Sequence, residues 1–153
     1  MINYFNGKLI TYIEGKHTKE EIIEMLVSFM ETNTDLIENK DEFYKQILER
    51  EAVGSTGIGM GVAVPHARSG GVKDVIVALA VLEYPVDFNS IDGELIKTIA
   101  LVGAPKDKSK EYLGLLSSLS KIFRVKKNRD AIKTARNQKE LVEAIMEIEA
   151  QWE

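Results

Sequence analysis

The spacing of apolar residues divides the chain into strand-like and helix-like segments. Residues 8–13 alternate with the period of two that is typical of a strand, and the apolar residues after Thr18 recur on one helical face. Thr18 and Glu21 have the spacing of a capping box, in which each side chain accepts a hydrogen bond from the other residue's amide, so a helix is predicted to begin there. A second helix is predicted to begin near Asn39 or Asp41.

The middle of the chain contains three apolar segments that predict strands. Residues 62–64 form a short one that ends at Pro65, and residues 75–82 and 95–102 form two longer ones. The longer segments are apolar almost without interruption, which is typical of strands covered on both faces. Residues 54–61 contain four glycines, which disfavour a helix, so this segment is predicted to be a loop.

The last third of the chain predicts two further helices. The first is expected to be capped by Ser109 or Asp107, and the second to begin after Asn137. The apolar stripe expected on the first consists of Leu113, Leu116, Leu119, Ser120 and Phe123. Helices and strands follow one another without a linker long enough to divide the chain, so we predict a single α/β domain over residues 1–153, built around a central sheet.

Composition narrows the classes of function. The formal net charge of −4 disfavours a general nucleic-acid binder, which needs a concentrated basic face. Residues 124–129 are locally basic, and we interpret them as a solvated turn after a helix. The chain has no cysteine, which excludes a disulfide, a thiolate metal site and a cysteine nucleophile within it.

We expect a cytoplasmic protein that is not inserted in a membrane. The first six residues lack the basic and apolar regions of a signal peptide. The longest uninterrupted apolar run, residues 75–82, is far shorter than the roughly 20 residues that span a bilayer. The absence of cysteine also fits the reducing cytoplasm.

His66 is the leading candidate for chemistry. It follows Pro65 at the end of a predicted strand, beside the glycine-containing loop. Neutral imidazole, whose unperturbed pKa is about 6.5, has an unprotonated nitrogen that can attack phosphorus. His17 precedes the first helix, and we interpret it as a surface residue. Two histidines and scattered carboxylates do not predict a metal site.

The loop of residues 54–61 is the second candidate, because its amides and the hydroxyls of Ser55 and Thr56 can surround an anion. Its spacing matches neither the dinucleotide fingerprint nor the P-loop, and a tight connection without a ligand is the alternative. Arg50 precedes this loop and suits a phosphate, although a cation at a helix C-terminus is equally expected. For Arg68 the surface role is favoured.

The contiguous segment from Arg50 to His66 resembles the active-site region of the fructose/mannitol/nitrogen-type IIA proteins, the EIIA type-2 family, of the bacterial phosphoenolpyruvate phosphotransferase system. The likeness continues through residues 85–93 and 104–105 to about Phe123. The resemblance implies a mixed sheet of about five strands with helices on both faces. It implies neither a metal nor an organic cofactor.

The resemblance also assigns roles. His66 is expected to accept a phosphoryl group from the phosphohistidine of the carrier protein HPr or a relative. It is then expected to donate the group to a cysteine of a IIB protein or domain, which phosphorylates a sugar during uptake. Arg50 is expected to hold the phosphate, with Ser55, Thr56 and Gly57 in the surrounding loop. The resemblance does not name the sugar.

One position departs from the family pattern. Many members carry a second histidine where this chain has Tyr112, which is therefore either a hydrogen-bond donor to the phosphate or a core residue of the helix. Three functions remain open. The chain is a phosphocarrier for sugar uptake, a regulatory IIA-like protein whose phosphorylation at His66 controls binding to other proteins, or a binding domain that is never phosphorylated.

Overall fold

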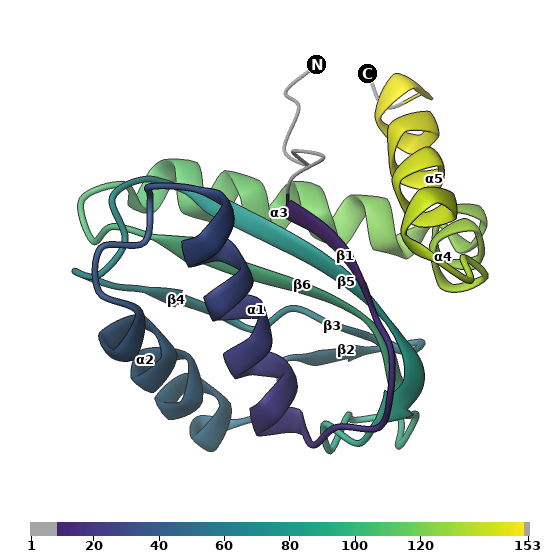
Figure 1. Ribbon diagram of the computed structural model, residues 1–153, viewed down its shortest axis with the longest axis horizontal. Helices are drawn as coiled ribbons and strands as arrows, with labels where there is room; N and C mark the ends of the chain where they lie inside the picture. Colours follow the sequence, from purple (N-terminus) through teal and green to yellow (C-terminus); the bar gives the residue numbers. More distant parts are fainter. Residues whose placement is uncertain (1–8, 152–153) are drawn as a thin grey trace.

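A mixed sheet of six strands is the centre of residues 9–151, the part of the chain that the computed structural model describes (Figure 1). The strands are β1 (Ile10–Ile13), β2 (Gly57–Gly59), β3 (Val62–Ala63), β4 (His66–Arg68), β5 (Ile76–Val86) and β6 (Ile96–Ala104). Their order is β1-β5-β6-β3-β2, and β4 also pairs with β6. The pairs β5–β6 and β2–β3 are antiparallel and the others are parallel. The expected mixed sheet is confirmed.

Five helices cover the two faces of this sheet. They are α1 (Lys19–Asn33), α2 (Lys40–Val53), α3 (Ser109–Arg124), α4 (Lys126–Lys133) and α5 (Gln138–Gln151). One buried cluster joins α1 and α2 to one face, and a second joins α3, α4 and α5 to the other. In Figure 1 the first pair lies in front of the sheet and α3 runs behind it. The predicted α/β class with helices on both faces is therefore confirmed.

Strands β5 and β6 are buried on both faces, as their apolar segments predict. In β5, Ala78, Ala80 and Leu82 belong to the cluster beneath α1 and α2. Their neighbours Val77 and Leu79 belong to the opposite cluster. This alternation follows from the two-residue period of a strand, and it supplies apolar side chains to both layers of helices.

The predicted helix starts are confirmed at three of the four helices. Thr18 and Glu21 form both hydrogen bonds of the capping box, and the Asn39 side chain caps α2. The side chain of Asn137 accepts a hydrogen bond from the Glu140 amide at 2.9 Å, at the start of α5. The cap expected for α3 is wrong: its N-cap residue is Lys108, which makes no side-chain cap bond.

Two further expectations for this region are wrong in part. The basic residues 124–129 are not only a turn, because α4 begins at Lys126 and includes most of them. Leu119 and Phe123 of the predicted α3 stripe are buried, but Leu113 is 62% exposed. Tyr112 and Leu115, which are not part of the predicted stripe, are buried. Apolar side chains occur on more than one face of α3, so periodicity alone does not select the face that contacts the sheet.

The segment 54–61, predicted as a loop, contains strand β2 and a tight hairpin turn to β3. Met60 and Gly61 at this turn have φ values of 59° and 78°. Positive φ at both central residues is the requirement of a type I′ turn, which matches the twist of antiparallel strands. Glycine supplies this conformation without strain, and the glycine-rich sequence here builds a hairpin.

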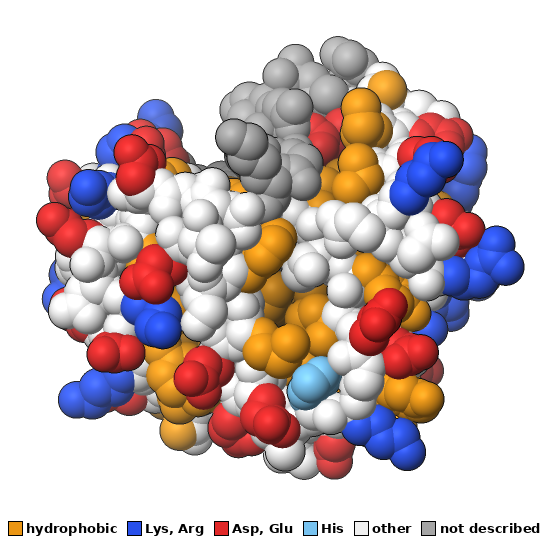
Figure 2. Space-filling view, in the orientation of Figure 1, with side chains coloured by type: hydrophobic (Ala, Val, Ile, Leu, Met, Phe, Trp, Pro, Cys, Tyr) orange, Lys and Arg blue, Asp and Glu red, His pale blue; other side chains and the backbone are white. Residues whose placement is uncertain are grey.

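Charged side chains of both signs are interspersed over the face shown in Figure 2, without a large basic area on its described part. Among residues 9–151, no helix is long and apolar enough to cross a membrane.

The Phe43 ring of α2 packs directly against Gly103 of β6, and this contact generates a stability prediction. A methyl group at Gly103 would lie 2.6 Å from the Phe43 ring, which is fully buried. We expect Gly103→Ala to lower the free energy of unfolding by about 1–3 kcal/mol, because a packed core must shift to admit it. Gly114→Ala is the matched control: a methyl group there meets nothing within 4 Å. It should raise stability by about 0.5–1 kcal/mol. Urea denaturation measures both, and equal effects would contradict the close approach.

Candidate functional site

His66 lies on an edge strand that is interrupted immediately before it. Ala63 in β3 pairs with Ile99, and His66 in β4 pairs with Val102, so both short strands follow β6 in one continuous register. Pro65, which stands at the interruption, has no amide hydrogen for the ladder. Its carbonyl nevertheless accepts a hydrogen bond from the Val102 amide at 2.9 Å. The interruption therefore removes the amide donor at Pro65, while the carbonyl of the same residue keeps the chain bound to β6.

The imidazole of His66 is oriented by a backbone carbonyl within this interruption. Its Nδ1 lies 2.6 Å from the carbonyl oxygen of Val64. A carbonyl only accepts hydrogen bonds, so this contact requires the hydrogen on Nδ1. The lone pair of the neutral ring is then on Nε2. The side chain is half-buried, and it lines two hollows that open beside it.

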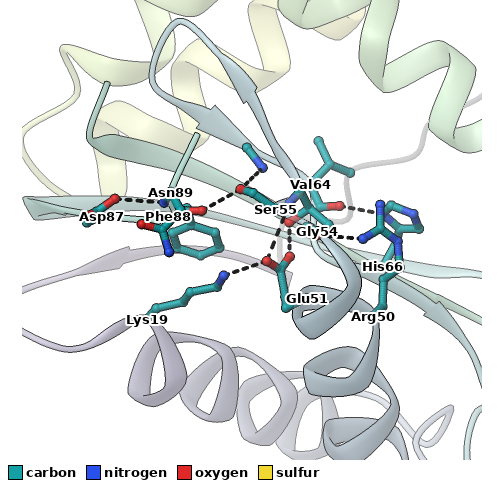
Figure 3. A network of polar contacts seen from close by, with 12 residues as sticks. Lys19, Arg50, Glu51, Gly54, Ser55, Val64, His66, Asp87, Phe88 and Asn89 are labelled. Atoms are coloured by element: carbon teal, nitrogen blue, oxygen red, sulfur yellow. Dashed lines mark hydrogen bonds and ion pairs between the residues drawn. The ribbon is translucent and has the colours of Figure 1, made fainter. Parts of the chain in front are cut away.

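Arg50 lies beside His66 at the end of α2 (Figure 3). Its Nη1 donates a hydrogen bond of 2.7 Å to the carbonyl of Gly54, the first residue after the helix. This bond directs the guanidinium toward the loop, and Arg50 lines both hollows together with His66. The two residues expected to work together are therefore adjacent, and the role of Arg50 in holding a phosphate stays a prediction.

The two hollows differ in chemical character. The charged hollow, about 620 Å³, is lined by Gln46, Glu49, Arg50, Val53, His66, Ala67, Arg68, Lys106 and Tyr112. The apolar hollow, about 330 Å³, is lined by Arg50, Ser55, Thr56, Gly57, Ile58, Val64, His66, Ile91, Leu116 and Ser120. Three cationic side chains and the Glu49 carboxylate thus line the charged hollow, whereas the apolar hollow shares Arg50 and is otherwise lined by uncharged residues.

The loop residues expected to contact a phosphate use their hydroxyls within the protein. Ser55 Oγ donates to the carbonyl of Phe88 at 2.5 Å and accepts a bond from the Gly57 amide at 3.0 Å. Thr56 Oγ1 donates a short hydrogen bond to Glu51. These contacts hold the loop against the segment after β5. Direct contact of Ser55, Thr56 or Gly57 with a phosphate stays a prediction.

Glu51 is a site residue that the sequence did not single out. It is buried, and its carboxylate forms an ion pair with Lys19 of α1 at 2.7 Å. A glutamate in the last turn of a helix is normally solvated, so nothing in the pattern of α2 distinguishes it. The one sequence feature that could have indicated a role for Glu51 is its position, directly after Arg50 and five residues before Thr56.

Tyr112 combines the two roles that the sequence left open. Its ring belongs to the core cluster beneath α3, and its side chain also lines the charged hollow. The ring centroids of Tyr112 and His66 are 6.1 Å apart. Among the described residues its hydroxyl has no hydrogen-bond partner. Burial raises the pKa of this phenol to about 12, against the opposing effect of Arg68 and Arg50, so it remains a donor at neutral pH.

The remaining candidates have other contacts. Arg68 Nη1 donates to the hydroxyl of Ser109 at 2.5 Å and lines the charged hollow. His17 is half-buried, and its Nε2 lies 2.8 Å from the Glu14 carbonyl at the start of the chain. It lines neither hollow, and His66 is therefore the candidate nucleophile.

The raised pKa of Tyr112 generates a prediction about alkaline stability. The unfolded chain loses this proton near pH 10, and the folded chain retains it to about 12. The contribution of the Tyr112 phenol to the free energy of unfolding is therefore fully present below pH about 10. It is lost as the pH rises toward 12, because the unfolded state then binds fewer protons than the folded state. Tyr112→Phe removes this contribution, so its free energy of unfolding should fall less steeply than that of the wild type across this interval. Urea denaturation at several alkaline pH values measures the slopes, and parallel slopes would refute it.

Comparisons with known proteins place the chain in one family. Residues 3–148 match the family model described as phosphoenolpyruvate-dependent sugar phosphotransferase system, EIIA 2. A fructose-specific EIIA component from Haloferax volcanii is 27% identical over 141 residues, which cover 92% of this chain and 91% of that protein.

Two solved structures have the same fold. The nitrogen regulatory protein IIA-Ntr from Neisseria meningitidis superposes with a TM-score of 0.79 and 28% identity, covering 92% of this chain and 94% of that one. The mannitol enzyme IIA of Escherichia coli, solved in complex with phosphorylated enzyme IIB, superposes with a TM-score of 0.74 and 17% identity, covering 94% and 97%. The chain belongs to the EIIA type-2 family of the phosphoenolpyruvate-dependent sugar phosphotransferase system.

Proposed function

We propose that this chain is a phosphohistidine carrier of a sugar phosphotransferase system, which accepts a phosphoryl group on His66 and passes it to a IIB partner. The observation that carries the proposal is the contact between His66 Nδ1 and the Val64 carbonyl, because it leaves the lone pair on Nε2. Arg50 beside the ring supplies a fixed positive charge. We expect this chain to work in the cytoplasm.

The first step is transfer from a phosphohistidine of an HPr-like protein. The Nε2 lone pair of His66 attacks phosphorus, and an N–P bond forms as the N–P bond of the donor breaks. The donor imidazole, which carries a hydrogen on its other nitrogen, leaves with that electron pair as the neutral ring, while His66 keeps its Nδ1 hydrogen and takes over the positive charge of the phosphorylated ring. The protein must align the two rings and stabilise the charge on the phosphoryl oxygens, because transfer needs no other covalent chemistry from it.

The charged hollow suits the phosphoryl group in this state. The group carries a charge near −2 at neutral pH, and it is stabilised by nearby fixed cations. Arg50, Arg68 and Lys106 line that hollow, and the guanidinium of arginine offers paired donors to phosphate oxygens. The Tyr112 hydroxyl, which has no partner among the described residues, is placed to donate one further hydrogen bond.

The second step returns His66 to its starting state. A thiolate of a IIB protein attacks phosphorus, an S–P bond forms, and the N–P bond breaks with its electrons returning to Nε2. Exposed apolar side chains that line the apolar hollow offer a contact surface to such a partner: Ile91 is 98% exposed and Ile58 is 47% exposed. The mannitol relative was solved with its phosphorylated IIB, which supports a partner of this kind.

A regulatory function is the second candidate. The similarity to the nitrogen regulatory protein from Neisseria meningitidis covers nearly the whole chain. In this alternative His66 is phosphorylated in the same way, and the phosphoryl group changes the affinity for a regulated protein. Both functions use the same first step and differ in whether a IIB thiolate removes the group.

Phosphorylation of His66 is the first outcome to test. Incubation with phosphoenolpyruvate, the first enzyme of the phosphotransferase system and HPr should label this chain with acid-labile phosphate. His66→Ala should remove the label completely because it removes the nucleophile, and His17→Ala should retain it. Autoradiography with labelled phosphoenolpyruvate measures the result, and persistent labelling of His66→Ala would sink the assignment.

A chase separates the two candidate functions. Addition of a fructose-type IIB domain to the labelled protein should remove the label within the time of a catalytic cycle if the chain serves transport. A label that remains on the chain favours the regulatory function. A IIB domain whose cysteine is replaced by serine is the control, since it lacks the accepting thiolate.

Tyr112 generates a prediction about the rate of transfer. Tyr112→Phe should slow phosphoryl transfer by about tenfold or more, because a hydrogen bond to a charged group contributes about 1.5–3 kcal/mol. Tyr112→His should change the rate of transfer to a IIB partner more than Tyr112→Phe, because imidazole differs from the phenol in both reach and charge. Single-turnover measurements give both rates. Unchanged rates in both variants would place Tyr112 in the core only.

A further inference from the structure

A buried ion pair lies behind the loop of the site, and the transfer steps described above make no use of it. The Glu51 side chain is 4% exposed and that of Lys19 is 17% exposed, with Nζ and Oε2 2.7 Å apart. Lys19 Nζ also lies 4.7 Å from the centre of the Phe88 ring (Figure 3). Burial of a carboxylate is costly unless the charge is paired and hydrogen-bonded. A pair maintained in this position is therefore a candidate for a specific task.

The carboxylate of Glu51 directs the residue at the centre of the loop. Its Oε1 accepts the short hydrogen bond from Thr56 Oγ1, and the amide of Thr56 lies 3.5 Å from Oε2. Hydrogen bonds to an ionised acceptor are stronger than those between neutral groups. Because Lys19 holds Oε2 from the other side, the carboxylate is fixed, and Thr56 is fixed with it.

Thr56 is joined to His66 through the backbone of Val64. The Thr56 carbonyl accepts a hydrogen bond of 3.0 Å from the Val64 amide. The Val64 carbonyl in turn accepts the contact of 2.6 Å from His66 Nδ1. On the far side, the Pro65 carbonyl is bound by the amide of Val102. The carbonyl that orients the imidazole is thus held between the sheet and the loop.

We propose that Glu51, held by Lys19, is a positioning residue for His66. Through Thr56 and the backbone of Val64, it fixes the imidazole as the Nδ1–H tautomer with its Nε2 lone pair toward the phosphoryl donor. The consequence for transfer rests on the proposed function, whereas the effect on the tautomer is a property of the unphosphorylated protein. The two are therefore testable separately.

The alternative is an ion pair that only stabilises the fold. Such a pair would lower the free energy of unfolding when it is removed, and it would leave the imidazole of the folded protein unchanged. A readout at the ring nitrogens distinguishes the two, because nitrogen chemical shifts differ between the tautomers. Thr56→Val is the most direct variant: it removes the hydroxyl that links the ion pair to the loop and keeps the shape of the side chain.

The experiment measures long-range ¹H–¹⁵N spectra of the unphosphorylated protein, with the His66 signals assigned by their loss in His66→Ala. The wild type should show mainly the Nδ1–H tautomer. Thr56→Val and Glu51→Gln should raise the fraction of the Nε2–H tautomer, and Thr56→Ser, which keeps the hydroxyl, should restore the wild-type spectrum. Phosphorylation by HPr should slow by about tenfold or more at saturating donor, with the KM for HPr unchanged, because misalignment affects the transfer step.

The matched control is Asp130→Asn, which removes the acceptor of an exposed ion pair with Lys126 on α4 and should change neither readout. A wild-type tautomer fraction in folded Thr56→Val overturns the inference, whatever the rate. If Thr56→Val does not fold, the double variant Lys19→Met with Glu51→Gln decides in the same way, since it removes both charges together. If HPr does not phosphorylate the wild type, only the proposed function fails, and the spectra still decide the role of Glu51.

Discussion

Pairing of residues 62–68 with one edge of β6 is the constraint on which the site depends. Both β3 and β4 keep the same register on β6, so the positions of Ala63 and His66 are fixed by the most buried part of the sheet. Between them, the Pro65 carbonyl stays bound to β6, whereas the Val64 carbonyl accepts the contact from His66 Nδ1 and orients the ring. The proposed nucleophile is thereby placed on a rigid element, which precise alignment of a phosphoryl group requires.

The two sides of His66 are chemically different, and this difference follows from which elements meet there. The end of α2 and the start of α3 bring Arg50 and Tyr112 to one side, together with Arg68 from β4. The loop after α2 and the middle of α3 bring apolar side chains to the other side. The charged side suits an anion, whereas exposed apolar groups suit a protein partner. Both features fit the exchange of a phosphoryl group between proteins that we propose for His66.

Polar groups buried behind the loop connect the first helix to this site. Lys19 begins α1, Glu51 lies in the last turn of α2, and Thr56 lies in the loop between α2 and β2. Their contacts connect the start of α1, the end of α2 and the loop that follows α2. The hydroxyls of Ser55 and Thr56 consequently form hydrogen bonds within the protein, which give the glycine-rich segment a defined shape.

The sequence by itself determined much of this protein. Apolar alternation and capping residues predicted α1, α2, α5 and the two central strands, because those signals depend on neighbours a few residues away. The segment from Arg50 to His66 indicated both the family and the candidate nucleophile. The exposed face of α3, the helix α4 and the strand β4 were not predicted. Each of these depends on contacts with distant segments, which local patterns do not contain.

Tertiary structure alone decided how the site residues work. Spacing placed Thr56 in a loop with free hydroxyls, but the folded chain brings Glu51 to it and uses the hydroxyl internally. Likewise, only the pairing of β4 with β6 set the Val64 carbonyl against His66 Nδ1 and left the lone pair on Nε2. Hydrogen bonds of this kind require distances near 3 Å between groups that the sequence alone does not bring together. The sequence therefore identifies the candidate nucleophile, while the packing of the sheet and helices selects the ring nitrogen that keeps its lone pair.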